Sequence, residues 1–192
     1  MGLRQAFVTL DTTGLPSKIP GWTPRIVALG LAVTEQGKVL HSTGGLIQQP
    51  AEHVEDPRTR GAWEANGIDP ASVIAAPATE IEVAASLKEA VRGCTLRGYN
   101  VDFLSPFLWG VPYYLQREWG RCVMEEAKRK VFPPDGRKRA WQDPRFPTLN
   151  ESLYWATARG HDVTAPNDVN NRAHANAVRV AKLAIAMESE RP

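Results

Sequence analysis

The sequence has few of the residues on which disulfide frameworks and zinc sites depend. Its 192 residues include two cysteines, Cys94 and Cys122, and four histidines, and no cysteine lies in a CxxC pair or at zinc-ligand spacing from a histidine. A disulfide scaffold or a structural zinc site needs more of these residues at closer spacing. We therefore expect two reduced, partly buried thiols.

Long apolar runs are absent as well. No stretch of about 18 apolar residues occurs, which is the length that a membrane-spanning helix needs, and the N-terminus lacks the charged-then-apolar pattern of a secretory signal. With 43% apolar residues and no Gly/Ser-rich linker or repeat, the chain is long enough to bury one sizeable core. These features predict a single cytoplasmic domain over residues 1–192, with a frayed tail at 188–192.

The formal net charge of +2 is too small to indicate nucleic-acid binding by itself. The basic residues are concentrated, however, because the segment between Arg117 and Arg145 holds nine basic and five acidic residues within a Trp-rich stretch at 109–147. This stretch predicts a surface for nucleic acid or for a protein partner, and a solvated surface without a partner is the alternative. Its candidate contact residues are Lys128, Arg129, Lys130, Arg137, Lys138, Arg139 and Trp141.

Apolar periodicities predict an α/β fold, a mixed sheet with helices on both faces. Strands are expected near 5–11, 26–34, 38–48 and 94–98, with a fifth short strand between 122 and 146. Helices are expected near 80–92, 103–118, 120–131, 149–159 and 171–188. We expect Trp155 in the core.

The first predicted strand ends in a pattern with a single carboxylate. Phe7-Val8-Thr9-Leu10-Asp11 runs directly into Thr12-Thr13-Gly14-Leu15. Because alternate side chains of a strand share a face, Thr9 and Asp11 point one way while Val8 and Leu10 point the other way.

This segment resembles the first motif, DxETTGL, of the DEDD-type 3′-to-5′ exonucleases, the family of proofreading exonucleases and ribonuclease T. Aligned without a gap, Thr9 stands at the Asp position of that motif and Asp11 at its Glu position. Residues 25–33 are similar to the family's second strand, and Asn66-Gly67-Ile68 to its HGI element. The resemblance extends from Phe7 to about Ala186 and implies a ribonuclease H-like architecture.

Residues 99–108 resemble the family's second motif, HNxxFDxxFL, and keep Asn100 and the apolar positions in register. Leu104 stands at the position of the metal-binding Asp. Asp102 lies two residues earlier, and we expect it to cap the following helix. A register slip that brings Asp102 to the site is the alternative.

Residues 171–177 resemble the third motif, HxAxxDA, with Asn171 in place of the general base and Asn176 in place of the last metal-binding Asp. An amide does not take a proton from water near neutral pH and brings no negative charge to a divalent cation. His174 lies about 300° around the helix from Asn171, so we expect an exposed or capping histidine and not a substitute base. The same expectation applies to His161 in the preceding loop.

Two-metal cleavage of a phosphodiester needs carboxylates that hold two cations about 4 Å apart. A single carboxylate among the family's positions does not meet this need. We therefore expect no catalytic residues, no metal and no cofactor, and the sequence favours a pseudo-enzyme. The degenerate positions are Thr9, Asp11, Leu104, Asn171 and Asn176.

The family's nucleotide-binding loop is nevertheless present. The leading hypothesis is a catalytically degenerate exonuclease-like protein that binds a single-stranded nucleic acid end or a protein partner, as an accessory subunit in nucleic-acid processing or in a phage-like viral assembly. The candidate nucleotide-binding residues are Thr12, Thr13, Gly14, Leu15, Asn66 and Asn100.

The alternative is a working 3′-to-5′ exonuclease, dependent on Mg²⁺ or Mn²⁺, with a rearranged acidic site. Such a site requires its carboxylates to converge within about 2.1 Å of one metal ion. Its candidate residues are Asp11, Asp102, Asp168 or Asp162, and His161 or His174.

Overall fold

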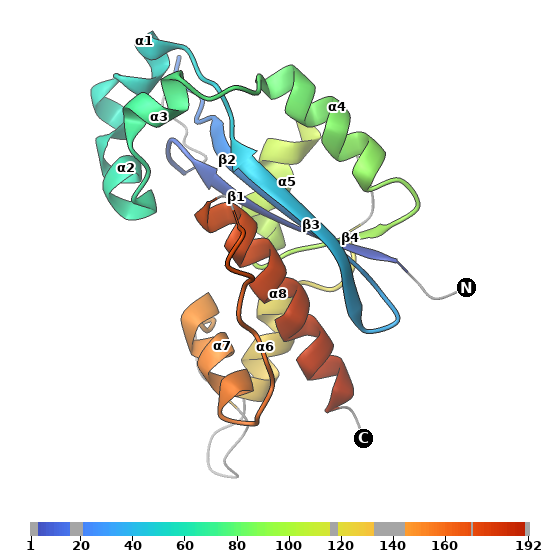
Figure 1. The fold of residues 1–192 in the computed structure, drawn as a ribbon. Coiled ribbons are helices and arrows are strands. Elements are labelled where there is room, and N and C mark those ends of the chain that lie inside the picture. Colours follow the sequence, from blue (N-terminus) through green and yellow to red (C-terminus); the bar gives the residue numbers. More distant parts are fainter. Residues whose placement is uncertain (1–3, 16–20, 116–118, 133–144, 170, 191–192) are drawn as a thin grey trace.

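A mixed sheet lies at the centre of the protein (Figure 1). The computed structural model describes residues 4–15, 21–115, 119–132, 145–169 and 171–190. Within these residues the strand order is β3-β2-β1-β4, with β1 antiparallel to β2 and parallel to β4. The strands are β1 (Gln5–Thr12), β2 (Ile26–Glu35), β3 (Lys38–Leu46) and β4 (Thr95–Arg97).

Helices cover both faces of the sheet, as predicted (Figure 1). One face packs against α8, with α6 and α7 beside it, and the other face packs against α4 and α5. The helices are α1 (Ala51–Val54), α2 (Arg60–Asn66), α3 (Pro70–Ile74), α4 (Glu80–Ala90), α5 (Val101–Trp109), α6 (Val123–Val131), α7 (Leu149–Thr157) and α8 (Arg172–Ser189), with a 3-10 turn at Pro57–Thr59. No described helix is long and apolar enough to span a bilayer.

The alternation along β1 separates core packing from polar contacts. Val8 packs with α4 and α5, whereas Phe7 packs in the cluster built on α8. Thr9 and Asp11 share the Phe7 face, and both reach residues of α8. The predicted common direction of Thr9 and Asp11 is therefore confirmed.

Two glycines let α8 approach the sheet closely. A Cβ at Gly30 of β2 would lie 2.1 Å from the carbonyl oxygen of Ala173, and a Cβ at Gly44 of β3 would lie 2.6 Å from Cβ of His174. Both distances are far below ordinary contact. The missing side chains therefore set how near the first turn of α8 comes to β1.

Local signals explain where the long helices begin. Thr79 and Thr148 each form a reciprocal capping box, with Glu82 and Glu151 respectively, which satisfies backbone N–H groups that lack partners in the first turn. Asn171 caps α8, because its Oδ1 accepts a bond of 2.8 Å from the backbone N–H of His174. The predicted starts at 80, 149 and 171 agree with the structure within one residue.

The prediction for the helix of the second motif is wrong in two respects. α5 ends at Trp109 and not near 118, because Pro112 follows closely and cannot continue a helix. Asp102 is not its cap, since it lies exposed in the first turn, while Asn100 takes the cap position in a left-handed conformation with φ of 65°. That conformation lets the chain turn from β4 directly into the helix.

Other predictions meet mixed outcomes. The helices between 51 and 74 were not expected. A fifth strand was predicted between 122 and 146, but α6 occupies part of this interval, and residues 133–144 lie outside the described residues. An isolated parallel bridge joins Leu96 to Trp119 before that interval. Trp155 is buried, as predicted, at 6% exposure. Cys94 and Cys122 are thiols outside any disulfide and are partly buried, as expected.

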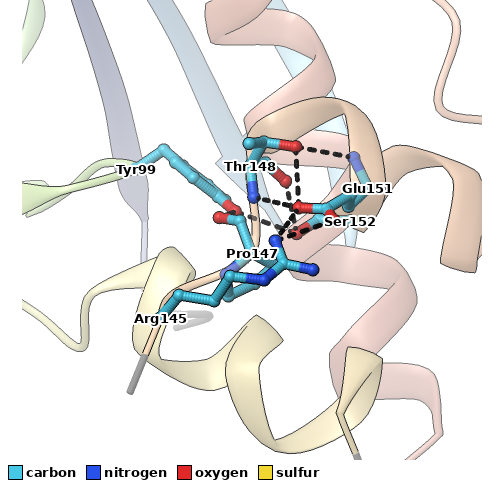
Figure 2. A network of polar contacts seen from close by, with 6 residues as sticks. All are labelled: Tyr99, Arg145, Pro147, Thr148, Glu151 and Ser152. Carbon is cyan, nitrogen blue, oxygen red and sulfur yellow. Dashed lines mark hydrogen bonds and ion pairs between the residues drawn. The ribbon is translucent and has the colours of Figure 1, made fainter. Parts of the chain in front are cut away.

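A polar network fixes the start of α7 against the end of β4 (Figure 2). The hydroxyl of Tyr99 donates to the carbonyl oxygen of Pro147 at 2.5 Å and lies 2.9 Å from Oγ of Ser152. Oγ of Ser152 lies 3.1 Å from the carbonyl oxygen of Thr148. Burial raises the pKa of Tyr99 to about 12, so the phenol remains a neutral donor.

The same network holds the side chain of Arg145. Nη1 of Arg145 donates to both carboxylate oxygens of Glu151, at 2.9 and 3.0 Å, while Glu151 completes the capping box with Thr148 (Figure 2). The network therefore holds Arg145 against the first turn of α7.

Replacing Tyr99 by Phe should lower the free energy of unfolding by about 1–2 kcal/mol, because it removes the hydroxyl that joins Pro147 to Ser152 and leaves buried groups less well satisfied. Urea denaturation measures this loss. Tyr154→Phe is the matched control, since Tyr154 lies on α7 with 78% exposure and its change should leave stability within about 0.5 kcal/mol. Equal effects of the two substitutions would contradict the assignment.

Candidate functional site

Three segments that resemble the exonuclease family meet at the C-terminal end of β1: β1 itself, the segment of Asn66, and the N-terminal end of α8. Asp11 of β1 is buried and forms an ion pair with Nη2 of Arg172, the first residue of α8. The same guanidinium donates to Oδ1 of Asn66 and to the carbonyl oxygen of Ala65, both at 2.9 Å. Nδ2 of Asn66 in turn donates to the carbonyl oxygen of Thr12 at 2.8 Å. Arg172 therefore ties β1, α2 and α8 together.

Arg172 was not predicted from the sequence. It stands at a variable position of the third motif, between Asn171 and Ala173, where the motif specifies no residue type. The one feature that could have indicated it is that it directly follows Asn171, the position of the family's general base. The guanidinium carries a fixed positive charge, so the buried carboxylate of Asp11 is neutralised by the chain itself.

The other positions at which this sequence departs from the family's motifs make packing and polar contacts within the chain. Thr9 donates from Oγ1 to the carbonyl oxygen of Ala173 at 2.5 Å. Leu104 is 2% exposed and packs over Gly98. Oδ1 of Asn176 accepts from Arg179 at 3.4 Å. These contacts give the positions structural roles.

These residues do not fit a pair of divalent cations. Hard cations such as Mg²⁺ require several oxygen ligands, mostly carboxylates. The family's metal-binding positions hold instead the hydroxyl of Thr9, which donates to Ala173, the apolar side chain of Leu104, the amide of Asn176, and the carboxylate of Asp11, which is bound to Arg172. In the described part of the chain, no group of three or more His, Cys, Asp or Glu side chains is placed to hold a metal ion.

The residues considered for a rearranged acidic site lie apart. His161 pairs with Glu190 at the C-terminal end of α8, at 3.1 Å, whereas Asp11 pairs at its N-terminal end. The 18 residues of α8 separate these ends by about 27 Å. Asp162 pairs with Lys182 at 2.6 Å, part of the way along the same helix.

Two further candidates of that site also differ from expectation. Asp102 and Asp168 are both exposed. His174 is buried at 6% exposure, and its Nε2 lies 2.9 Å from Oγ of Ser42 on β3. The expectation that His174 is exposed or capping is therefore wrong, because Gly44 leaves room for its side chain between α8 and β3.

The loop after β1 is held firmly. Thr13 is fully buried, and its Oγ1 accepts from the backbone N–H of Arg25 at 2.8 Å and lies 3.1 Å from Nε2 of His53. Thr12 donates from Oγ1 to the carbonyl oxygen of Gly14 at 2.7 Å. The side chains of Thr12 and Thr13 thus shape the loop, and do not face solvent.

The exposed part of the predicted nucleotide-binding set lies beyond these threonines. Leu15 is 73% exposed, and Gly14, Asn66 and Asn100 are partly exposed.

Trp22 packs directly on this loop. A Cβ at Gly14 would lie 2.8 Å from Cη2 of Trp22, so only glycine admits the indole there. The ring lies parallel to that of His53, with centroids 6.3 Å apart, and the guanidinium of Arg58 lies 5.5 Å from the indole centroid. An aromatic and cationic cluster therefore adjoins the loop, and the sequence analysis did not select it.

Stability should decrease as the pH falls below about 6.5. Burial lowers the pKa of His53 from its ordinary value of 6.5, with the charge of Arg25 as a second cause, and burial also lowers the pKa of His174. The unfolded chain therefore binds protons at a higher pH than the folded chain does, so the free energy of unfolding drops as the pH falls through this range.

Replacing His53 by Gln should make this pH dependence shallower between about pH 5 and pH 7, because the amide can keep a bond to Thr13 without titrating. Urea denaturation at several pH values measures the slope. His41→Gln is the control, since His41 is exposed on β3 and should leave the slope unchanged. An unaltered slope in the His53 variant would refute the assignment.

The predicted basic surface is described only in part. Lys128, Arg129 and Lys130 form the last turn of α6, where Nζ of Lys128 lies 4.8 Å from the ring centroid of Phe146 and Lys130 donates to the carbonyl oxygen of Glu190 at 3.1 Å. Arg129 is exposed. The remaining candidates, Arg137, Lys138, Arg139 and Trp141, lie outside the described residues.

Comparison with solved structures assigns the fold. The chain is similar to exonuclease X in complex with 5′-overhanging duplex DNA, with 18% identity, a TM-score of 0.62, and coverage of 97% of this chain and 92% of that one. It is also similar to exonuclease I from Methylocaldum szegediense, with 16% identity, a TM-score of 0.69, and coverage of 99% of this chain and 41% of that one. The protein thus has the ribonuclease H-like α/β fold of these exonucleases.

A further match is exonuclease I of E. coli in complex with a 5cy-dT13 oligonucleotide, with 16% identity and a TM-score of 0.66. The chain is covered completely by this match but spans only 41% of that protein. No protein-family model and no curated protein sequence matches the chain. At these identities, the likeness concerns the fold.

Proposed function

We propose that this chain is a catalytically degenerate, exonuclease-like protein that binds the end of a single-stranded nucleic acid without cleaving it. One observation carries the proposal: the guanidinium of Arg172 forms an ion pair with Asp11, the carboxylate at the family's Glu position. An organic cation fixed in the cleft attracts a phosphate, but it does not generate a hydroxide from water as a bound metal does.

The surroundings of Arg172 support an anionic, hydroxyl-bearing ligand. The Arg172 side chain is 44% exposed, so its guanidinium is available to a phosphate as well as to Asp11. Oδ2 of Asp11 and Nδ2 of Asn171 are buried with no hydrogen-bond partner among the described residues. A terminal sugar hydroxyl donates to the first, and a phosphate oxygen accepts from the second.

The solved exonuclease I and exonuclease X structures contain an oligonucleotide and a duplex with an overhang, respectively, and this supports nucleic acid as the ligand class. We propose that neither Mg²⁺ nor Mn²⁺ is needed for binding. The role that follows is that of an accessory subunit in nucleic-acid processing or in a viral assembly, with Lys128, Arg129 and Lys130 as a second contact surface for nucleic acid or a protein.

The test uses fluorescently labelled single-stranded DNA and RNA, linear and circular, with Mg²⁺, Mn²⁺ or EDTA. We expect linear strands to bind with an affinity that decreases with salt, circular strands to bind more weakly, and no strand to be shortened. Shortening of the strands by the native protein, abolished by Asp11→Ala, would overturn the proposal in favour of a metal-dependent exonuclease. Absence of binding at low salt would also overturn it.

The contribution of Arg172 is tested by Arg172→Lys, which keeps the charge but loses the planar two-point geometry, and by Arg172→Met, which loses both. Affinity should fall in that order. Arg92→Met is the matched control, because Arg92 is 74% exposed and pairs with the exposed Glu89 of α4 and not with Asp11. Thermal melting of each variant separates lost binding from lost folding.

A further inference from the structure

A cavity of about 610 Å³ opens on the face of the sheet opposite α8. Its lining residues come from the segment that enters β2, the first turn of α4, and the second half of α5 with the residues after it. Ligand pockets for small molecules commonly have volumes of about 300–1,000 Å³. The cavity is therefore large enough for a nucleoside or a mononucleotide, and it is separate from the pair of Asp11 and Arg172.

The walls of this cavity suit a flat ring. Trp22 and Phe107 both line it, together with Ile81 and Val111, which are each 72% exposed. Phe107 is held in place by Phe103, whose ring centroid lies 5.3 Å from its own. Aromatic faces favour planar ligands of any base type, so the walls supply affinity but no choice among bases.

The charged groups of the cavity provide the selectivity among bases. Oε2 of Glu80 lies 4.0 Å from Nη1 of Arg25, and both side chains line the cavity. Nη1 of Arg25 also lies 3.4 Å from Oε1 of Gln49, which leaves other guanidinium N–H groups for a ligand. Burial raises the pKa of the Glu80 carboxyl, and the nearby Arg25 opposes this rise. A hydrogen bond from Gln49 to Glu80 also opposes the rise in pKa, so a carboxylate held by Gln49 stands beside the guanidinium of Arg25.

Two buried donors near this pair have no hydrogen-bond partner in the described part of the chain: Nε1 of Trp22 and Oη of Tyr113. Trp22 is a wall of the cavity, and Tyr113 follows its two last lining residues, Val111 and Pro112. Burial raises the pKa of Tyr113, and the charge of Glu80 contributes to this rise. Buried polar groups are normally satisfied, so a ligand with acceptor atoms suits this place.

We propose that this cavity binds a guanine base, stacked on Trp22 and Phe107, with its N1–H and N2–H₂ donated to Glu80 and its O6 accepting from Arg25. Guanine alone among the four common bases presents two adjacent donors followed by an acceptor on its Watson–Crick edge. Adenine places one donor beside an acceptor, cytosine one donor beside two acceptors, and uracil a donor between two acceptors. The carboxylate and guanidinium are complementary to guanine only.

Isothermal titration calorimetry with the 5′-monophosphates of guanosine, adenosine, cytidine and uridine tests this proposal on the full chain. We expect GMP to bind about tenfold more tightly than AMP, the discrimination that a good two-point base contact gives. Equal binding of the four nucleotides, or no binding of GMP at millimolar concentration, would overturn the proposal.

Variants separate this site from the cleft. Glu80→Gln should weaken GMP binding about tenfold, whereas Glu89→Gln, an exposed carboxylate on the same helix, should leave it unchanged. Trp22→Leu should weaken all four nucleotides together, and it provides an independent test if the Glu80 variant unfolds. Normal GMP binding by Glu80→Gln would refute the base contact.

The guanine can come from a free nucleotide or from a base in a strand. Competition between GMP and single-stranded DNA with or without guanine distinguishes these sources: displacement of GMP only by guanine-containing strands identifies a strand base, and no displacement identifies a free nucleotide. Because Arg172→Met should impair strand binding at the cleft but not GMP binding, failure of the proposed function and failure of this inference give different results.

Discussion

Replacing Gly30 by Ala should lower the free energy of unfolding by about 3 kcal/mol, an effect at the upper end for overpacking. The added Cβ would lie 2.1 Å from the carbonyl oxygen of Ala173 and 2.6 Å from the backbone nitrogen of His174. Neither is the end of a flexible side chain, and β2 is held between β1 and β3. The first turn of α8 must therefore move away from the sheet.

Such a shift also stretches the contacts of Thr9 with Ala173 and of Asp11 with Arg172, so oligonucleotide binding should weaken together with stability. Urea denaturation and binding titrations measure the two effects. Gly45→Ala is the matched control, because Gly45 lies on the neighbouring strand β3 and nothing stands within 4 Å of its added Cβ. If the two variants are equally stable, α8 does not approach the sheet as described.

Replacing Arg172 by Met should lower the free energy of unfolding by about 2 kcal/mol at pH 7. Breaking a fully buried ion pair costs about 3–5 kcal/mol, and the 44% exposure of the Arg172 side chain reduces this by solvent screening. The loss arises because Asp11, at 6% exposure, is left buried without its partner. The contacts of Arg172 with Ala65 and Asn66 are lost as well.

A double-mutant cycle isolates the charge effect. Asp11→Asn should restore much of the stability when it is combined with Arg172→Met, because the double variant buries no unpaired carboxylate. The cycle is measured by urea denaturation of the four proteins. If the double variant is no more stable than Arg172→Met, the loss comes from packing or from the contacts with α2.

The secondary structure was predictable from the sequence where a local pattern, such as strand alternation, agrees with the packing of the folded chain. The strand alternation around Thr9 and Asp11 and the apolar periods of the helices expected from 80, 149 and 171 define elements that the structure confirms. In the structure these helices are capped by Thr79, Thr148 and Asn171. These signals suffice because the period of an element and the chemistry of its first turn are local properties.

The errors in the fold have physical causes beyond the local pattern. The apolar run after Asn100 continues past Trp109, so periodicity alone extends α5, whereas the turn at residues 110–113 ends it. The short helices between 51 and 74 are too brief to show a period. His174 was expected at the surface because the sequence does not reveal that Gly44 on a distant strand leaves space for it.

For the candidate site, the sequence indicated which segments meet but not how they are held. The motif positions led to Thr9, Asp11 and Leu104, yet the residue that determines the charge of the cleft, Arg172, is at a position where the motif specifies nothing. Trp22 was equally invisible, since its role depends on contact with Gly14 across a loop. Which of these residues touch a ligand stays a prediction.

The pair formed by Asp11 and Arg172 also restricts how this cleft could change by successive substitutions. Removing the arginine first leaves a buried charge uncompensated, and adding a carboxylate first, at Thr9 for example, gives the arginine a second anion to hold. Neither single step creates room for a cation, and the first one reduces stability. A cluster of carboxylates able to hold a metal ion at these positions would therefore need several simultaneous replacements.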